Sequence, residues 1–293
     1  MPASRTLRIV HLFPDLLNVY GDGGNVRTLV ARTIARGIRA DVVEVRHGAA
    51  RIEPGDLYLI GGGQDREQVT VAAELERLGG ELRGRLDAGA ALVAVCGGYQ
   101  NLGRAIRTRD GDLGGPGVLP IVTDVRPHGR RLVGPIVISA PASIAALGAS
   151  GAAAAGVPGA ETTIVGFENH GGRTTVDAGA SPLGHVLQGH GNNGVDGTEG
   201  VIACASRDGL PTWVGTYLHG PLLPRNPHLA DALIAGALAR GGRTPALAPL
   251  DDRLEWTAHA EYARRIRRAE EAERRLPGWA HTVVDPLRSL IGF

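Results

Sequence analysis

The sequence predicts an α/β fold in which a mostly parallel sheet carries helices on both faces. Uniformly apolar runs, such as residues 57–60 and 91–95, alternate with longer segments whose apolar residues have helical spacing. Strands of this kind are typical of parallel sheets that are buried on both sides. Three glycine-rich stretches, 21–24, 61–63 and 97–98, lie in loops that follow predicted strands. Because binding sites of open α/β sheets lie beyond the carboxyl ends of the strands, these loops are where a functional site is expected.

The first half of the chain is predicted to follow the order β-α-β-β-α-β-α. Apolar or alternating runs indicate strands at residues 7–13, 41–46, 57–60 and 91–95. Helical spacing indicates helices at 26–35, at 67–86 with a possible break at the glycine pair 79–80, and at about 98–106. None of the glycine-rich loops matches a dinucleotide-binding or phosphate-binding motif, so nucleotide binding has little support.

The second half of the chain is more irregular and contains shorter strands. Strands are expected at residues 136–138, 163–167, 201–205 and 213–219, with a polar turn at 168–173 and a glycine-rich turn at 189–194. The alanine-rich segment 141–160 is expected to be a mobile loop or an insertion. Amphipathic or charged patterns predict helices at 226–240 and 251–276.

We divide the chain into a domain of residues 1–245 and a helical extension of residues 246–293. The helix predicted in this extension carries i,i+4 pairs of glutamate and arginine, such as Glu261 with Arg265. Its apolar stripe is narrow and consists of Leu254, Tyr262, Ile266 and Leu276. A helix that lies against the domain with a solvated outer face is expected, and docking of a partner is the alternative.

Composition narrows the possible classes of function. The 293 residues are 43% hydrophobic, and their net charge of +1 gives no electrostatic reason to expect nucleic acid or an anionic membrane as partner. Two distant cysteines, without a CxxC pair, argue against a disulfide framework and against a cysteine-based metal site, and they favour a cytoplasmic location. The uncharged run 132–160 contains three prolines, so no membrane span is expected there, and the N-terminus does not resemble a signal peptide.

Cys96 is the leading candidate for a catalytic nucleophile. It follows the apolar run 91–95 and precedes Gly97 and Gly98, which is a pattern of strand, sharp turn and helix. Such a turn places the nucleophile in a strained position above the sheet, and the start of a helix favours its thiolate. On this pattern alone, a buried structural cysteine is the alternative. Cys204 lies in an apolar run without neighbouring glycines and is expected to be a core residue.

A cysteine that attacks an amide also needs a proton carrier. Four of the ten histidines lie near predicted strand ends or turns, namely His11, His170, His190 and His219. His219 is the leading candidate because it ends an apolar strand and precedes a rigid Gly-Pro turn. His170 is the second candidate.

The same chemistry needs donors for the oxyanion and a group that binds the substrate. The backbone N–H groups of Gly62 or Gly63 and of Gly97 are suitable oxyanion donors by position. An arginine is suited to bind a substrate carboxylate, and from the residues alone Arg130 and Arg131 are equal candidates.

Six longer motifs in one order resemble a known family. They are YGDGGN at 20–25, IGGGQDREQ at 60–68, VCGGYQ at 95–100, GFENHGGR at 166–173, GHGNN at 189–193 and GTYLHGP at 215–221. Across roughly residues 7–240 the chain resembles the cobyric-acid-synthase-like branch of the class I glutamine amidotransferases. Within that branch it is similar to the glutaminase subunits of lipid II isoglutaminyl synthases.

This resemblance implies a flavodoxin-like α/β fold and hydrolysis of L-glutamine to glutamate and ammonia. It implies no cofactor in this subunit, because ATP is used by a Mur-ligase-like synthetase subunit with which the glutaminase forms a heterodimer. The synthetase activates the D-glutamate of the lipid II stem peptide, and ammonia converts it to D-isoglutamine during peptidoglycan synthesis.

The resemblance also assigns residues. It implies that Cys96 is the nucleophile and His219 the general base and acid, and it selects Arg131 over Arg130 as the arginine that contacts glutamine. The expected substrate-binding set is completed by Gly62, Gly63, Gly97 and Gln100.

The sequence departs from the wider class I pattern after the catalytic histidine. Most class I enzymes have a glutamate two residues later, whereas this chain has Pro221 there. The cobyric-acid-synthase-like branch also lacks that glutamate. Asp22 is a candidate for the group that orients His219, and an ordinary turn aspartate is the alternative reading. A Cys–His pair without a third member is also sufficient in principle, since a thiol needs less activation than a hydroxyl.

Three classes of function remain open from the sequence. The first is a glutaminase of this branch, with lipid II or another acceptor. The second is a cysteine hydrolase of small peptides on the same fold. A non-catalytic regulator that only binds a ligase-like subunit is the third possibility, and the presence of both Cys96 and His219 argues against it.

Overall fold

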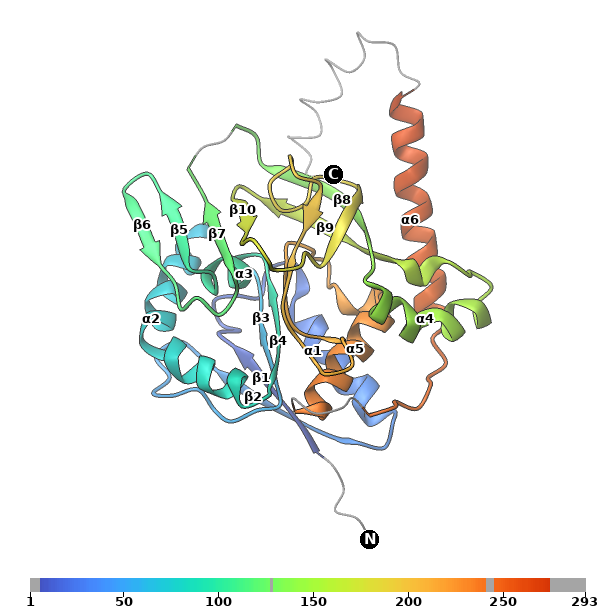
Figure 1. Cartoon of the computed structure of the whole chain (residues 1–293), viewed down its shortest axis with the longest axis horizontal. Coiled ribbons are helices and arrows are strands. Elements are labelled where there is room, and N and C mark those ends of the chain that lie inside the picture. Colours follow the sequence, from blue (N-terminus) through green and yellow to red (C-terminus); the bar gives the residue numbers. More distant parts are fainter. Residues whose placement is uncertain (1–5, 127–128, 241–244, 275–293) are drawn as a thin grey trace.

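A six-stranded sheet forms the centre of the protein (Figure 1). The computed structural model describes residues 6–126, 129–240 and 245–274. The strand order is β13-β14-β4-β3-β1-β2, in which only the edge strand β13 is antiparallel to its neighbour. Their bounds are β1 Thr6–Leu12, β2 Arg39–Val45, β3 Leu57–Ile60, β4 Ala91–Val95, β13 Val201–Ala205 and β14 Pro211–Thr216. The predicted mostly parallel α/β fold is confirmed.

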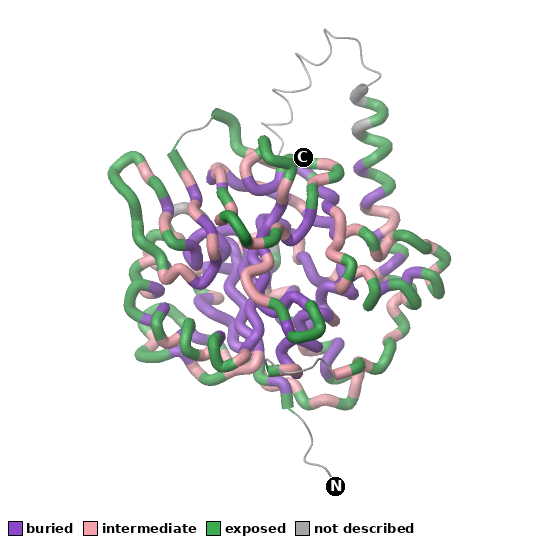
Figure 2. The backbone as a smooth tube through the Cα atoms, in the orientation of Figure 1, coloured by how far each residue is buried: buried purple, intermediate pink, exposed green. Residues whose placement is uncertain are grey.

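Helices cover both faces of this sheet. Figure 1 shows α1 (Gly23–Ile34) and α5 (Pro227–Ala239) on one side, and α2 (Asp65–Asp87) with the short α3 (Gly97–Asn101) on the other. Strands β1, β3 and β4 are almost entirely buried, which is why their sequences lack a polar face. Figure 2 shows the same pattern, with the central strands buried and the outer turns of α2 exposed.

Two smaller four-stranded sheets lie near the carboxyl end of the central sheet (Figure 1). One has the order β10-β7-β5-β6, with bounds β5 Ala105–Thr108, β6 Gly111–Gly114, β7 Ile121–Asp124 and β10 Arg173–Val176. The other has the order β12-β11-β8-β9, with bounds β8 Leu132–Ser139, β9 Thr163–His170, β11 Gly184–Gln188 and β12 Thr198–Glu199. They place residues from the middle of the chain above the loops that follow β1, β3, β4 and β14.

The expectation of a mobile loop at 141–160 is wrong. This segment forms helix α4 (Ala142–Ala154), followed by the single turn η2 (Ala160–Thr162). Alanine has the highest helix propensity, and the two glycines within α4 serve packing. Cβ atoms added at Gly148 and Gly151 would each lie 2.7 Å from the ring of Trp256, a buried residue of the C-terminal helix.

The C-terminal helix α6 (Arg253–Arg274) packs against the domain, as expected. It contacts α4, η2, the turn η3 (Leu223–Arg225), β8 and β9. Its buried residues differ partly from the predicted stripe, since Leu254 is 78% exposed while Trp256, Ala263 and Ile266 are buried. Leu276 lies outside the described residues.

An ion-pair network anchors the segment that leads into α6. Arg32 of α1 donates hydrogen bonds to both carboxylate oxygens of Asp231 and of Asp252, at 2.6–2.8 Å. Arg36 donates a third hydrogen bond to Asp231, at 2.7 Å. Because Arg32 is 6% exposed and its charge is shared by two carboxylates, loss of either aspartate would leave a poorly solvated cation.

Three other details differ from the sequence prediction. Helix α2 continues through the glycine pair 79–80, where Gly79 packs against Pro116. The helix after Cys96 ends at Asn101 instead of near residue 106, and strand β5 follows it. Cys204 is half-buried instead of core, because its strand is the edge strand of the sheet. Within the described ranges, no helix is both long and apolar enough to cross a membrane.

Candidate active site

Cys96 occupies a strained turn directly after β4. Its backbone has φ of +48° and ψ of −106°, a conformation that residues with a side chain rarely adopt. The N–H of Cys96 donates to the carbonyl of Thr216 at 2.8 Å, which ties the turn to the end of the neighbouring strand β14. The residue is only 7% exposed, yet it lines a cavity. This is the geometry predicted for a nucleophile held above a sheet.

His219 lies three residues after the end of β14. The predicted strand ends earlier, at Thr216, and His219 forms an isolated bridge with Phe167 of β9. The N–H of His219 donates to the Phe167 carbonyl at 2.7 Å, and the N–H of Phe167 donates back to the His219 carbonyl at 3.3 Å. The position of the histidine is therefore set by β9 as well as by its own strand.

Gly62 packs directly against both Cys96 and His219. A Cβ atom on this residue would lie 2.8 Å from Cε1 of His219 and 3.1 Å from Cβ of Cys96. The absence of a side chain at Gly62 therefore permits the close approach of all three residues, which come from loops after β3, β4 and β14. The structure brings together the two residues that the sequence predicted to be catalytic.

Burial keeps the imidazole of His219 uncharged at neutral pH. The pKa of His219 is lowered to about 3, first because the ring is removed from water and then because His170 and Arg131 add positive charge nearby. A neutral imidazole is able to accept a proton from a thiol. Its protonated form would be a strong acid at this position and would readily return that proton.

Asp22 contacts the same glycine. The N–H of Gly62 donates to Oδ2 of Asp22 at 2.7 Å, and the aspartate side chain is fully buried. Burial raises the pKa of Asp22 to about 7, against the lowering effect of the Gly62 hydrogen bond. The sequence prediction gave Gly62 a role as an oxyanion donor, whereas here its N–H is engaged by Asp22.

A cavity of about 660 Å³ opens above these residues. Its walls come from the loops of the central sheet and from the two smaller sheets. Of the predicted site residues, those that line it are Cys96, His219, Gly63, Gln100 and Arg131, together with the second histidine candidate, His170.

The cavity distinguishes the two adjacent arginines. Arg131 lines it, and its guanidinium donates from Nε to Oδ1 of Asn169 at 3.0 Å and from Nη2 to the Asn169 carbonyl at 3.1 Å. Arg130 is not part of the lining. Because Arg131 lines the same cavity as Cys96 and His219, its positive charge is suited to a substrate that carries a carboxylate.

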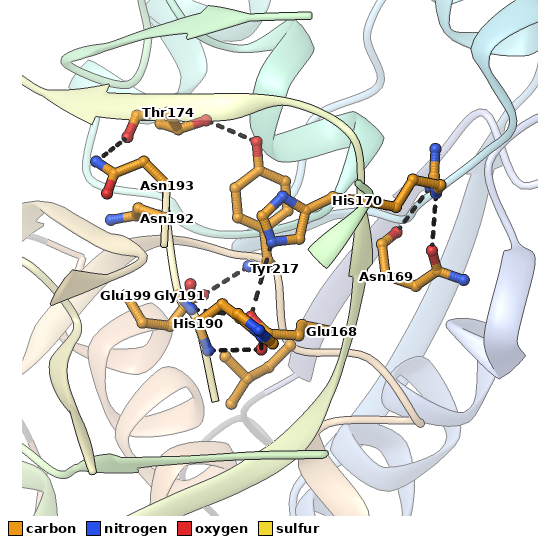
Figure 3. Close-up of polar contacts among 12 residues, drawn as sticks. Glu168, Asn169, His170, Thr174, His190, Gly191, Asn192, Asn193, Glu199 and Tyr217 are labelled. Atoms are coloured by element: carbon orange, nitrogen blue, oxygen red, sulfur yellow. Dashed lines mark hydrogen bonds and ion pairs between the residues drawn. The ribbon is translucent and has the colours of Figure 1, made fainter. Parts of the chain in front are cut away.

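A buried polar layer supports the floor of the cavity (Figure 3). The ring of His170 stacks on that of Tyr217 with centroids 3.5 Å apart. The Tyr217 hydroxyl accepts from Nε2 of Gln100 at 2.9 Å and shares a hydrogen bond of 2.6 Å with the Thr174 hydroxyl. Because this bond fixes the amide of Gln100, the residue reaches the cavity in one orientation.

The sequence did not indicate the role of Glu168. It belongs to β9 and not to the expected polar turn, and it is fully buried. Its oxygens accept from the N–H groups of His190 and Gly191 at 2.7 and 2.9 Å, and from Nδ1 of His190 at 2.9 Å (Figure 3). Burial acts to raise the pKa of Glu168, yet this pKa is lowered, because His190 donates a hydrogen bond to the carboxylate and Nε2 of His170 lies 3.7 Å from its Oε2. The two motifs 166–173 and 189–193 are thus parts of one structure.

The remaining histidine candidates do not reach the cavity. His11 lies buried within β1, and His190 is about half exposed beside Glu168. Neither is part of the cavity lining. Within the described ranges, the side chains of histidine, cysteine, aspartate and glutamate form no group of three that could hold a metal ion.

Comparison with known proteins agrees with this site. Residues 8–227 match the family described as the CobB/CobQ-like glutamine amidotransferase domain. The chain is 38% identical over 238 residues to the lipid II isoglutaminyl synthase (glutamine-hydrolyzing) subunit GatD of Staphylococcus aureus, covering 80% of this chain and 86% of that protein. It is 31% identical over 261 residues to the protein of the same name from Streptococcus pneumoniae, covering 88% and 90%.

A solved structure described as a glutamine amidotransferase shares the fold. The two structures superpose with a TM-score of 0.50 at 17% sequence identity, over 78% of this chain and 98% of the other. The family match extends over most of the chain and includes both Cys96 and His219. This chain belongs to the CobB/CobQ-like glutamine amidotransferases.

Proposed function

We propose that this protein is a glutaminase subunit in which Cys96 hydrolyses L-glutamine through a thioester. The observation that carries the proposal is the contact of Cys96 and His219 with one glycine, Gly62, beneath a cavity that Arg131 and Gln100 also line. A strained cysteine, a neutral histidine and a carboxylate-binding arginine are the groups that attack on a side-chain amide requires.

The first half-reaction forms the thioester. The neutral imidazole of His219 takes the thiol proton of Cys96, and the sulfur attacks the carboxamide carbon of glutamine. The tetrahedral intermediate then breaks its C–N bond, and His219 returns the proton to the departing nitrogen, which leaves as ammonia. The low pKa of His219 favours this return, because its protonated form is a strong acid.

The second half-reaction releases glutamate. A water molecule gives a proton to His219 while its oxygen attacks the thioester carbon, and the C–S bond breaks to restore the Cys96 thiol with that proton. The backbone N–H groups of Gly63 and Gly97 are the proposed oxyanion donors. The Gly62 N–H joins them only if it leaves Asp22, since it donates to that carboxylate here.

Arg131 and Gln100 are the proposed substrate-binding residues. Arg131 is suited to pair with the α-carboxylate of glutamine, while Asn169 holds its guanidinium in place. Gln100 presents the rest of its amide to the cavity, since its Nε2 is bonded to Tyr217. The positive charge of Arg131 selects a free amino acid over an internal residue of a peptide.

The names of the two relatives support a role in lipid II amidation. In this proposal, ammonia passes to a Mur-ligase-like synthetase subunit in a cytoplasmic heterodimer. That subunit uses ATP to activate the D-glutamate of lipid II, and the product is D-isoglutamine. The pathway would serve peptidoglycan synthesis and cell shape.

The test is glutamate release from L-glutamine by the full chain, alone and co-purified with the synthetase. Cys96→Ala and His219→Ala are expected to abolish release, and a glutamine-analogue electrophile is expected to label Cys96. Cys204→Ala, which removes the other thiol from a half-buried edge position, is the matched control and is expected to retain activity. Glutamate release by Cys96→Ala would contradict the proposal, and turnover of ordinary small peptides would favour a cysteine hydrolase.

A further inference from the structure

The C-terminal helix α6 makes polar contacts with Gly166 and Arg225, which belong to two segments next to His219 in space. This helix begins at Arg253, beyond the stretch 8–227 that matches the amidotransferase family. None of the described residues of α6 lines the cavity. The helix therefore takes no direct part in lining the cavity, and it lies outside the part of the chain that matches the family.

The first contact reaches the strand that pairs with His219. The hydroxyl of Tyr262 donates to the carbonyl of Gly166 at 2.9 Å. Gly166 directly precedes Phe167, whose backbone exchanges two hydrogen bonds with His219. A Cβ atom on Gly166 would lie 2.8 Å from Cβ of Leu218, so this strand also packs tightly against the residue before the histidine.

The second contact reaches the residue after His219. The guanidinium of Arg225 lies over the ring of Tyr262, 4.7 Å from its centroid, and its Nη1 donates to the carbonyl of Gly220 at 3.1 Å. Gly220 has φ of +119°, which is the conformation that turns the chain away after the histidine. Nδ1 of His259 on α6 also bonds to the Arg225 carbonyl at 2.8 Å.

These contacts matter because β14 ends at Thr216, three residues before His219. Beyond this strand the N–H of Tyr217 donates to Glu199 and that of Leu218 donates to the Thr216 hydroxyl. The backbone of His219 and Gly220 is held by the Phe167 bridge and by the Gly220 contact. Both depend in turn on Tyr262, one through a hydrogen bond and the other through the stacked guanidinium. Proton transfer between Cys96 and His219 is sensitive to displacements well below 1 Å.

We propose that Tyr262 and Arg225 are positioning residues for His219, through which α6 holds the catalytic histidine in register with Cys96. This inference rests on the proposed glutaminase reaction. It assigns to the C-terminal extension a part in catalysis, although none of the described residues of α6 lines the cavity.

The test uses two conservative variants of the full chain. Tyr262→Phe removes only the hydroxyl and keeps the ring beneath Arg225, while Arg225→Lys keeps the charge and loses the planar group that stacks. Each is expected to lower kcat for glutamine hydrolysis by about tenfold. KM for glutamine is expected to stay within about twofold, because the lining of the cavity is unchanged.

Ile266→Val is the matched control. Ile266 is buried on the same helix against Val137 and Val165, so the substitution weakens packing of α6 but leaves both polar contacts in place. Its kcat is expected to equal that of the unmodified protein. Unchanged kcat in both Tyr262→Phe and Arg225→Lys would overturn the inference, as would an equal loss in Ile266→Val.

The same assays separate failure of this inference from failure of the proposed function. If Cys96→Ala or His219→Ala retains glutamine hydrolysis, the proposed function itself is wrong. If both of those variants are inactive while Tyr262→Phe and Arg225→Lys have normal kcat, only the role of α6 is wrong.

Discussion

The carboxylate of Asp22 accepts a hydrogen bond of 2.7 Å from the backbone N–H of Gly62, the glycine that packs against Cys96 and His219. Asp22 follows β1 and Gly62 follows β3, so this bond joins the loops of two adjacent parallel strands. It fixes a glycine that packs against both Cys96 and His219. Asp22, the residue proposed from the sequence to orient His219, thus contacts Gly62, which packs against that histidine.

Asp22→Ala is expected to destabilise the protein and to lower glutamine hydrolysis. The buried N–H of Gly62 would lose its acceptor, which costs about 1–3 kcal/mol. Asp22→Asn keeps an acceptor oxygen for this N–H and is expected to retain most of the stability. Urea unfolding and steady-state kinetics on both variants check the expectation. Equal behaviour of the two variants would show that the hydrogen bond has no such role.

Gly62→Ala is expected to reduce kcat by at least about 100-fold, because the added methyl group would displace His219 from Cys96. Far-ultraviolet circular dichroism should show an unchanged fold. Gly84→Ala, on helix α2 with nothing within 4 Å of the added Cβ, is the matched control. It is expected to keep full activity and to gain up to about 1 kcal/mol of stability from helix propensity. Similar activity of the two variants would refute the packing argument.

Arg131→Ala is expected to raise KM for glutamine by about tenfold or more, since the lost pairing with a carboxylate is worth at least about 1.5 kcal/mol. Arg130→Ala is the natural control, because Arg130 is the adjacent arginine and does not line the cavity. Its KM is expected to stay within about twofold of the unmodified protein. A larger effect of Arg130→Ala than of Arg131→Ala would reverse the assignment.

The parts of the site that the sequence predicted are those whose signal is local. The run 91–95 and the glycines after it already indicate a strand and a sharp turn, so the position of Cys96 was evident. His219 was found by its place near a strand end, although the strand itself stops at Thr216. The choice between Arg130 and Arg131 needed the family resemblance, because nothing in two adjacent arginines tells them apart.

The parts that the sequence missed depend on contacts between distant segments. The sequence predicts a polar turn that begins at Glu168. The residue is nevertheless buried, because its carboxylate accepts hydrogen bonds from N–H groups 22 and 23 residues later. The segment 141–160 has the composition of a low-complexity loop, yet Gly148 and Gly151 within it pack against the ring of Trp256, about one hundred residues away. Such partners leave no periodic signal in the sequence around either residue.

The buried carboxyl group of Glu199 gives the stability of the protein a defined pH dependence. It is fully buried, and it accepts hydrogen bonds from the Thr216 hydroxyl and from the N–H of Tyr217, each at 2.7 Å. Burial raises its pKa from 4.5 to about 8, against the lowering effect of these bonds. Between these pH values the unfolded chain releases the proton while the folded protein keeps it. The contribution of Glu199 to stability therefore falls as pH rises across this window, by up to about 1.4 kcal/mol per pH unit.

Glu199→Gln removes this titration and is expected to become progressively more stable relative to the unmodified protein between pH 4.5 and 8. Above pH 8 the difference should level off, because both states of the unmodified protein are then ionised. Urea unfolding at a series of pH values measures the difference, and any cost of the new amide hydrogens is the same at every pH. Glu76→Gln, at an exposed position of α2, controls for the substitution itself. If the stability difference between Glu199→Gln and the unmodified protein does not change with pH, the Glu199 carboxyl group is ionised in the folded protein as readily as in the unfolded chain.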